Sequence, residues 1–344
     1  MQELTQLLEH RLFITQISKV VSFCAFLGLV GCSVGQDEKA QQYLFRSLTG
    51  DYKVNVVAML KQRQSGEKGS LIVKIQKSKD GKTRETVLSP LHMQCEYLDD
   101  GTNIQTYSPD DRTLLVQPSN QPNQDLPFRT QLIQKNYLLK TEPSKKIAGR
   151  NCVVVLANAR YSQISSIRYY FDEKTGFPLS KETIQPDGDV SVEFEVIDVK
   201  YPAKLDSSIF KIEPPVGYET ISFSEPKKIN SLSEAARMLG FSPSVPTQIP
   251  FGFRIQRMTT TKNSKWKALC IKLTDGLQKV TVYEWIPEPG ETIKTGENRV
   301  IKLHNGVNIM IVSDIDSSVR NSLIRSFLVM ADRENPVMLT RIGL

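Results

Sequence analysis

Hydrophobic and polar residues alternate along much of this chain, a pattern that predicts β-structure. The even-numbered positions of residues 52–60 are all apolar, and Leu71, Val73 and Ile75 repeat the alternation after a glycine-containing turn. A period of two turns one face of a strand toward a core and the other toward solvent. Turn signals separate further expected strands at 83–88, 93–98, 104–107, 113–116, 152–156, 167–171 and 190–199. Short strands joined by tight turns indicate an antiparallel meander.

Two segments of this region have a helical period instead. Residues 38–49 carry an apolar face that includes Tyr43 and Leu44, and Gly50 follows as a stop signal. Residues 128–140 form the second expected helix. We expect both helices to cover the apolar face of the sheet.

A second unit begins near residue 223. Ser231 and Glu234 form a capping box for a helix over 232–239. Expected strands follow at 253–260, 268–273, 280–286 and 308–312, with a helix at 317–330. A length of 344 residues suggests about two domains, and we place them at 32–222 and 223–344.

The first 31 residues resemble a lipoprotein signal peptide. Residues 20–31 are uncharged and apolar, and as a helix they would span about 18 Å, less than the bilayer core of about 30 Å. Leu29-Val30-Gly31-Cys32 resembles the bacterial lipobox, which implies cleavage after residue 31 and lipidation of Cys32. The alternative is an uncleaved anchor that extends back to Leu12, with Lys19 in its middle. Both interpretations place the remaining chain outside the cytoplasm and at a membrane.

The charge of the chain is moderately basic. Lys and Arg number 44 against 37 Asp and Glu, a formal net charge of +7. Such an excess favours contact with an anionic lipid surface or an acidic partner. The basic residues are spread along the chain without a run of five, so we do not expect nucleic acid as a partner.

Little in the sequence suggests catalysis. The three histidines are His10, His92 and His304, and no motif of a zinc protease, serine hydrolase or nucleotide-binding loop occurs. Asp99-Asp100 and Asp110-Asp111 are adjacent pairs within turns, and adjacent strand residues point to opposite faces. We therefore expect no enzyme activity, no catalytic residues, no cofactor and no metal site.

The cysteines leave one question open. Apart from Cys32 and Cys24 in the leader, the chain contains Cys95, Cys152 and Cys270. Cys95 and Cys152 lie in strand-like segments of one domain and either form a disulfide or remain buried thiols.

Turn motifs follow one another in a distinctive order. Residues 96–103 read EYLDDGTN and lead to Tyr107-Ser108-Pro109. Ala148-Gly149-Arg150 precedes a valine-rich strand, and residues 170–179 combine Tyr-Phe-Asp with Thr-Gly-Phe-Pro-Leu. In this order the segments resemble the RseB/MucB family of extracytoplasmic sigma-factor regulators and the related LolA-type lipoprotein carriers.

The second domain favours the first of these families. Pro250-Phe251-Gly252-Phe253, residues 269–277 and residues 280–283 resemble the second domain of RseB, which a minimal LolA-type carrier lacks. The resemblance covers nearly all of residues 40–330. The leader is a departure, because typical RseB-like proteins are soluble in the periplasm.

The resemblance implies an α+β fold in which a curved antiparallel half-barrel sheet, covered by helices, precedes a smaller C-terminal α+β domain. The concave face of such a sheet is wide enough to hold acyl chains, each buried CH₂ contributing about 0.8 kcal/mol. The alternative is that the same side chains fill a solid core. The candidate lining residues are Val54, Val56, Leu71, Val73, Tyr97, Val192 and Phe194.

These observations predict a non-catalytic, membrane-anchored envelope protein. Its first domain would bind a lipid or a lipoprotein acyl chain, and its second would bind a partner such as a membrane-bound anti-sigma factor. A LolA-like carrier of lipid or lipoprotein is the alternative function, and a purely structural envelope lipoprotein is a third.

Overall fold

The structure is a computed structural model that describes residues 37–333, except 51, 64–68, 91–94, 111, 120–124, 214–215, 223–226, 263–266 and 289–298. The expected signal peptide and Cys32 lie outside the described residues. The chain divides into two compact units. Of the described residues, the N-terminal unit contains those in 37–130 and 137–222, and the C-terminal unit contains those in 131–136 and 227–333.

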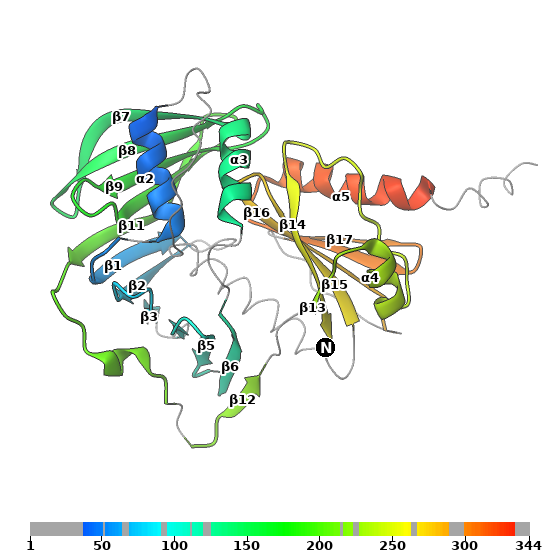
Figure 1. Cartoon of the computed structure of the whole chain (residues 1–344), viewed down its shortest axis with the longest axis horizontal. Coiled ribbons are helices and arrows are strands. Elements are labelled where there is room, and N and C mark those ends of the chain that lie inside the picture. The colour runs from blue at the N-terminus through cyan, green and yellow to red at the C-terminus, as the bar shows by residue number, and fades with distance from the viewer. Residues whose placement is uncertain are drawn as a thin grey trace, which may run out of the picture. The chain divides into compact units, whose positions relative to one another are not determined.

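A twelve-stranded sheet forms the N-terminal unit, in the order β12-β6-β5-β4-β3-β2-β1-β11-β10-β9-β8-β7. Its strands are β1 (Val56–Arg63), β2 (Ser70–Lys77), β3 (Thr83–Ser89), β4 (Glu96–Asp99), β5 (Asn103–Ser108), β6 (Thr113–Pro118), β7 (Tyr137–Ile147), β8 (Arg150–Ala159), β9 (Ser166–Asp172), β10 (Pro178–Ile184), β11 (Val190–Lys200) and β12 (Glu219–Ser222). All neighbours are antiparallel except β12 and β6. The sheet is curved and stays open, with β12 and β7 as its edges (Figure 1).

Two bulges in β11 change which of its side chains face the core. Phe194 pairs with Lys181 of β10 and Val192 with the next residue, Glu182, so Val192 and Phe194 lie on opposite faces. Along β1 the register likewise skips one residue of β11, Ile197. The period of two over residues 190–199 predicts that Val190, Val192, Phe194 and Val196 share one face, and the bulges make this prediction wrong. Val190, Val192 and Ile197 are 54%, 43% and 49% exposed.

Helix α2 (Glu38–Thr49) has the bounds that the sequence predicts. The Asp37 side chain accepts a hydrogen bond from the Ala40 N–H at 3.0 Å and caps the first turn. Gly50 ends the helix with φ = 65°, a left-handed conformation that suits glycine. Figure 1 shows α2 lying across the sheet near β7, β8 and β9, and it contacts β7 and β8.

Helix α3 (Leu126–Asn136) is shorter than the expected helix over 128–140. From Tyr137 onward the chain belongs to β7, where Tyr137 and Leu139 are fully buried and Lys140 is exposed. This period of two fits pairing with β8 and overrides the helical tendency of the sequence. A short 3-10 helix, η3 (Ser207–Phe210), packs on β3.

The C-terminal unit is a six-stranded antiparallel sheet with two helices of its own. The strand order is β13-β14-β15-β16-β18-β17. The elements are β13 (Lys227–Lys228), α4 (Leu232–Leu239), β14 (Arg254–Lys262), β15 (Lys267–Thr274), β16 (Lys279–Trp285), β17 (Arg299–His304), β18 (Val307–Val312) and α5 (Ser317–Arg333). Helix α4 contacts β15, and α5 contacts β17 and β18. The expected capping box is present, because Ser231 Oγ accepts from the Glu234 N–H and Glu234 Oε2 from the Asn230 N–H.

The predicted fold class is confirmed: a curved antiparallel sheet with helices precedes a smaller α+β unit. Strands β7, β10, β12, β13 and β17 were not expected from the sequence. Across the described residues no helix is both long enough and apolar enough to span a bilayer.

Candidate functional site

An apolar cluster on the N-terminal sheet contains most of the candidate lining residues. Val56, Leu71, Val73 and Tyr97 belong to this cluster and are each at most 4% exposed. The other buried members are Tyr52, Ala58, Leu60, Ile75, Val87, Cys95, Ile104, Ile147, Cys152, Val154, Tyr170, Phe177, Leu179 and Val196. We call this set the apolar cluster.

Three candidate residues lie outside this buried set. Val54 and Phe194 are partly buried and pack against the apolar cluster. Val192 does not join it, because the bulge at Glu193 turns the Val192 side chain to the opposite face. The structure thus brings six of the seven candidates together. Their role as a ligand lining stays a prediction.

Two charged residues are buried on the same face as this cluster. Lys77 of β2 is 2% exposed and Glu85 of β3 is 3% exposed. Glu85 pairs across the sheet with Ile75 on one side and Tyr97 on the other. Lys77 Nζ lies 5.0 Å from the centroid of the Tyr52 ring, a cation–π contact. The alternation along β2 indicates the burial of Lys77, because Lys77 is in phase with Leu71, Val73 and Ile75.

Burial controls the protonation of Glu85. Loss of solvation raises the pKa of Glu85 well above its ordinary value, and this effect exceeds the opposing influence of the Lys77 charge. The negative charge of Asp99 raises the Glu85 pKa further. The charged form of Glu85 is therefore disfavoured by its burial.

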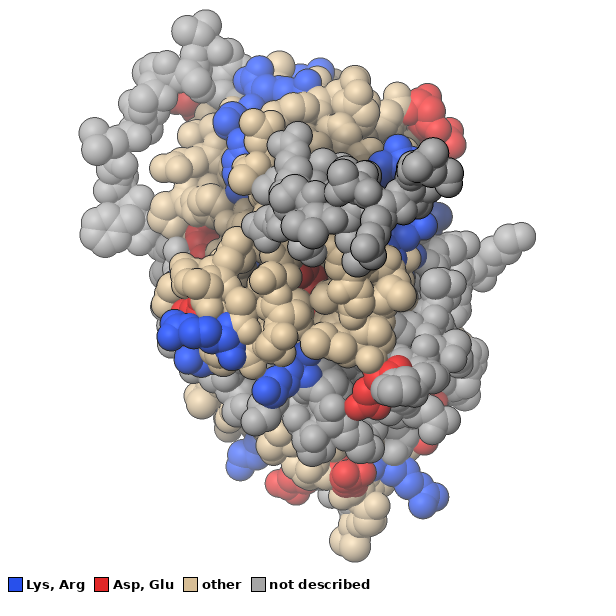
Figure 2. Space-filling model, turned by 90° about the vertical axis from the view of Figure 1, so that its right-hand side faces the viewer, with Lys and Arg blue, Asp and Glu red and all other residues tan. Residues whose placement is uncertain are grey.

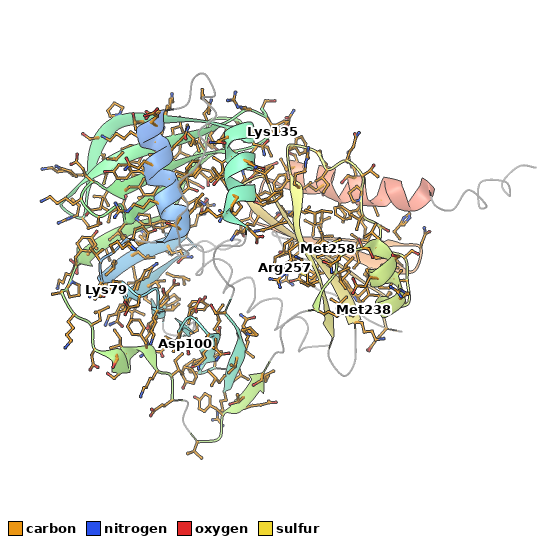
Figure 3. The ribbon with its side chains drawn as sticks, in the orientation of Figure 1. Lys79, Asp100, Lys135, Met238, Arg257 and Met258 are labelled. Atoms are coloured by element: carbon orange, nitrogen blue, oxygen red, sulfur yellow. The ribbon has the colours of Figure 1, made fainter. Side chains whose placement is uncertain are left out.

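Asp99 and Asp100 organise the turn between β4 and β5. Asp99 Oδ1 accepts hydrogen bonds from the Gly101 N–H and from Ser119 Oγ, both at 2.9 Å. Asp100 Oδ1 accepts from the backbone N–H groups of the next turn residues, Thr102 and Asn103. Figure 3 shows Asp100 in this turn and Lys79 in the turn between β2 and β3. The acidic pair thus has a structural role in the turn.

The thiols of Cys95 and Cys152 are buried and are not joined in a disulfide. Burial raises the pKa of Cys95 to about 12 and that of Cys152 to about 11, so both are protonated at neutral pH. Of the two interpretations of Cys95 and Cys152, the structure therefore agrees with buried thiols.

Asp172 organises the motif at residues 170–179 through the hydrogen bonds of its carboxylate. Its carboxylate accepts from Arg150 Nε at 2.6 Å, from the Tyr201 hydroxyl at 3.0 Å and from the Thr175 N–H at 3.0 Å. Burial alone would raise the pKa of Asp172, but these hydrogen bonds outweigh it and lower the pKa below its ordinary value. Asp172 thereby joins the start of β8, the turn after β9 and the chain after β11.

Asp37 fastens α2 to the open edge of β7. Its Oδ2 atom accepts from the backbone N–H of Thr141 at 2.8 Å and from the Thr141 hydroxyl at 2.6 Å. The Asp37 N–H donates to the Leu139 carbonyl at 3.3 Å. Farther along the helix, the Tyr43 ring lies 6.0 Å from that of Phe171. The start and the middle of α2 therefore both contact the sheet.

The C-terminal unit contains a buried glutamate that the sequence did not single out. Glu284 of β16 is fully buried, and its Oε2 atom accepts from the Ser244 N–H at 2.9 Å. Burial raises the pKa of Glu284 to about 7, although the Ser244 hydrogen bond acts in the opposite direction. Leu269 and Ile309 are its cross-strand neighbours.

The described residues show little that resembles a metal or nucleic-acid site. Among them, no group of three or more His, Cys, Asp and Glu is arranged to hold a metal ion. On the face drawn in Figure 2, Lys and Arg side chains form separate small groups between uncharged residues. The features that distinguish the N-terminal unit are thus its apolar cluster and the fixed helix α2.

Comparison with known proteins identifies the fold. Residues 57–213 match the family model of the MucB/RseB N-terminal domain. No curated protein sequence matches the chain significantly. The crystal structure of MucB is similar at a TM-score of 0.57 and 14% identity, covering 84% of this chain and 98% of MucB.

The complex structure of Pseudomonas aeruginosa MucA/MucB gives a comparable result, with a TM-score of 0.57, 16% identity, 84% coverage of this chain and 97% of that one. MucB in complex with MucA(peri) is similar at a TM-score of 0.56 and 15% identity, covering 83% of this chain and 96% of that one. At these identities the likeness establishes the fold. The turn motifs from residue 96 to residue 179 lie inside the matched family domain. Residues 57–213 thus match the MucB/RseB N-terminal domain, and the chain shares the fold of MucB over 84% of its length.

Proposed function

We propose that this chain is a membrane-anchored envelope regulator that binds an anti-sigma factor and responds to lipid. The observation that carries the proposal is the MucB-like fold over 84% of the chain, which includes the second domain. MucB itself has been solved in complex with MucA. A protein with the same two-domain fold has the architecture needed to bind a partner of that kind.

Co-purification tests the partner. The full chain, expressed in its own host with a C-terminal affinity tag, is cross-linked in intact cells and isolated from solubilised membranes. We expect a membrane-spanning protein with an extracytoplasmic segment to be enriched over a tagged control lipoprotein that carries the same leader. Recovery of equal sets of proteins from both samples would contradict the proposed partner.

The lipid-binding part of the proposal is supported by the composition of the apolar cluster. Its side chains come from both halves of an open sheet, and an open sheet leaves one face for an additional layer. A buried acyl chain contributes about 0.8 kcal/mol per CH₂, so a chain of ordinary length supplies ample binding energy. Glu85 and Lys77 are polar groups on the same face for the head of such a ligand.

Native mass spectrometry of protein extracted from membranes tests this part. We expect the wild-type chain to retain a lipid, and Val73→Phe to lose it because the larger ring takes up acyl volume. Ile72→Phe is the matched control, since Ile72 precedes Val73 on β2 and points to the opposite face. If the cluster is instead a filled core, Val73→Phe lowers the free energy of unfolding by about 1–3 kcal/mol and no lipid is retained by any variant.

The anchor is proposed at Cys32. Intact mass of the membrane-extracted chain should correspond to cleavage after Gly31 plus a diacylglyceryl group and a further acyl chain on the new N-terminus. Cys32→Ser should abolish the added mass. Membrane retention of an unprocessed chain would favour the uncleaved anchor instead.

A further inference from the structure

The open edge of β7 carries exposed lysines and contacts Asp37 at the start of α2. Strand β7 is the last strand of the twelve-stranded sheet, so one side of its backbone has no neighbouring strand among the described residues. Asp37 bonds to this side, because the Leu139 carbonyl and the Thr141 N–H both point to Asp37 instead of to β8. The chain therefore enters the N-terminal unit at this edge.

The distance from this entry point to the membrane is short. Five residue steps separate Cys32 from Asp37, and a fully extended chain covers at most about 3.6 Å per residue, or roughly 18 Å in all. The same limit holds whether Cys32 carries a lipid or ends an uncleaved anchor. Because Asp37 is fixed to Thr141, the β7 edge near Thr141 stays within this distance of the bilayer surface.

Basic residues surround this entry point. The hairpin of β7 and β8 with the residue after it, residues 137–160, contains five basic residues and one acidic residue. The acid, Glu142, already forms an ion pair with Arg168 at 2.6 Å. Lys140, Lys145 and Lys146 on β7 are exposed.

The charges of this edge are available to a ligand. Among the described residues, Lys140, Lys146 and Arg160 form no ion pair. Lys146 is five residues from Thr141, about 17 Å along the strand, which is similar to the reach of the tether. The exposed lysines of β7 thus begin beside Thr141 and continue along the edge strand. The adjacent Lys145 and Lys146 point to opposite faces of the sheet, and Lys145 Nζ lies 5.1 Å from the centroid of the Tyr170 ring.

We propose that the β7 edge, with Lys140, Lys145 and Lys146, lies against the anionic phospholipid surface of the membrane that holds the chain. This inference rests on the membrane anchor of the proposed function. The lysines bind phosphate-bearing headgroups through charge, an attraction that acts within about one Debye length, near 8 Å at physiological salt. Lysines on an edge strand also discourage pairing with another chain, so the test must separate lipid contact from that role.

Lysine footprinting on vesicles makes the separation. The full anchored chain is reconstituted in phosphatidylglycerol-rich vesicles, in phosphatidylcholine vesicles and in detergent, and acylation of each lysine is followed by mass spectrometry. Lys79, Lys82 and Lys204 are exposed reference lysines in the same unit. Lys79 and Lys82 flank the β2–β3 turn, and β2 lies six strand spacings, about 29 Å along the sheet, from β7.

We expect Lys140 and Lys146 to react at least about threefold more slowly in phosphatidylglycerol vesicles than in detergent, with the reference lysines unchanged. Phosphatidylcholine or high salt should remove the protection. In the variant Lys140→Gln/Lys145→Gln/Lys146→Gln, protection of Lys39 in the first turn of α2 should also disappear. The control Lys79→Gln/Lys82→Gln/Lys204→Gln has the same net charge and should keep it.

The outcomes distinguish this inference from the proposal on which it rests. A chain that does not stay on vesicles would overturn the anchor and this inference together. A chain that stays on vesicles, but in which β7 lysines and reference lysines react alike, would overturn this inference alone. Equal behaviour of the two triple variants would also overturn it.

Discussion

Glu284 offers a direct test of how burial controls stability in the C-terminal unit. Its carboxyl group is fully buried in β16 between Leu269 and Ile309, and the Ser244 N–H is its one hydrogen-bond donor among the described residues. The substitution Glu284→Gln keeps the size of the side chain and a carbonyl oxygen for the Ser244 N–H. It removes the ability to ionise and replaces the other carboxyl oxygen with an NH₂ group.

The magnitude follows from the pKa of Glu284, which burial raises from its ordinary value of 4.5 to about 7. Between these two pH values the folded state holds a proton that the unfolded state has released, so the free energy of unfolding falls as pH rises. The difference of about 2.5 pKa units corresponds to a loss of about 3 kcal/mol that is complete above pH 7. Below pH 4.5 the loss vanishes. Glu284→Gln should therefore match the wild type in acid and exceed its stability by up to about 3 kcal/mol at pH 8.

Tryptophan fluorescence can follow this unit, because Trp285 lies in β16 and is buried. Urea unfolding of the full chain at several values between pH 5 and pH 8 gives the difference between wild type and variant. The control Glu288→Gln changes an exposed glutamate of the same unit and should leave the pH dependence unchanged. Parallel pH profiles for wild type and Glu284→Gln would refute the reasoning.

Three further substitutions test other parts of the fold. Asp172→Asn should lower the free energy of unfolding at neutral pH by about 3 kcal/mol, as measured by circular dichroism. The difference from the wild type should shrink as the pH falls through the lowered pKa of Asp172, because the wild type then loses the same charge. Gly252→Ala should lower the free energy of unfolding by about 1–3 kcal/mol more than Gly240→Ala, as measured by tryptophan-monitored unfolding. Both glycines have positive φ, but an added Cβ at residue 252 would meet Asn136 Oδ1 at 2.4 Å. Asp37→Ala should lower the stability of α2 by about 1 kcal/mol, so that amide exchange in this helix, measured by mass spectrometry, becomes about fivefold faster. Unchanged exchange would show that the cap does not hold the helix.

Local sequence signals were sufficient where an element depends on its own residues. Asp37 and Gly50 cap α2, and Ser231 with Glu234 caps α4, so both helices have the bounds that the sequence predicts. Most strands of both sheets were also expected, since alternation reports which face is buried. The order of turn motifs was enough to indicate the family, because each motif fixes a turn through short-range hydrogen bonds.

Tertiary contacts decided the features that depend on a neighbouring strand. The bulge at Glu193 exists because β10 and β11 pair in a shifted register, and no residue of β11 alone announces that Val192 will face outward. Likewise α3 ends at Asn136 because β8 offers a partner for the next residues.

The buried charges of Lys77 and Glu85 also depend partly on the local sequence and partly on tertiary structure. Alternation placed Lys77 and Glu85 on the inner face, but hydrophobicity alone argues against charged residues there. Only the assembled sheet supplies the Tyr52 ring and the mutual proximity that accompany their burial. A sequence determines the period of each segment, whereas register, bulges and the surroundings of buried charges arise from pairing between segments that are distant along the chain.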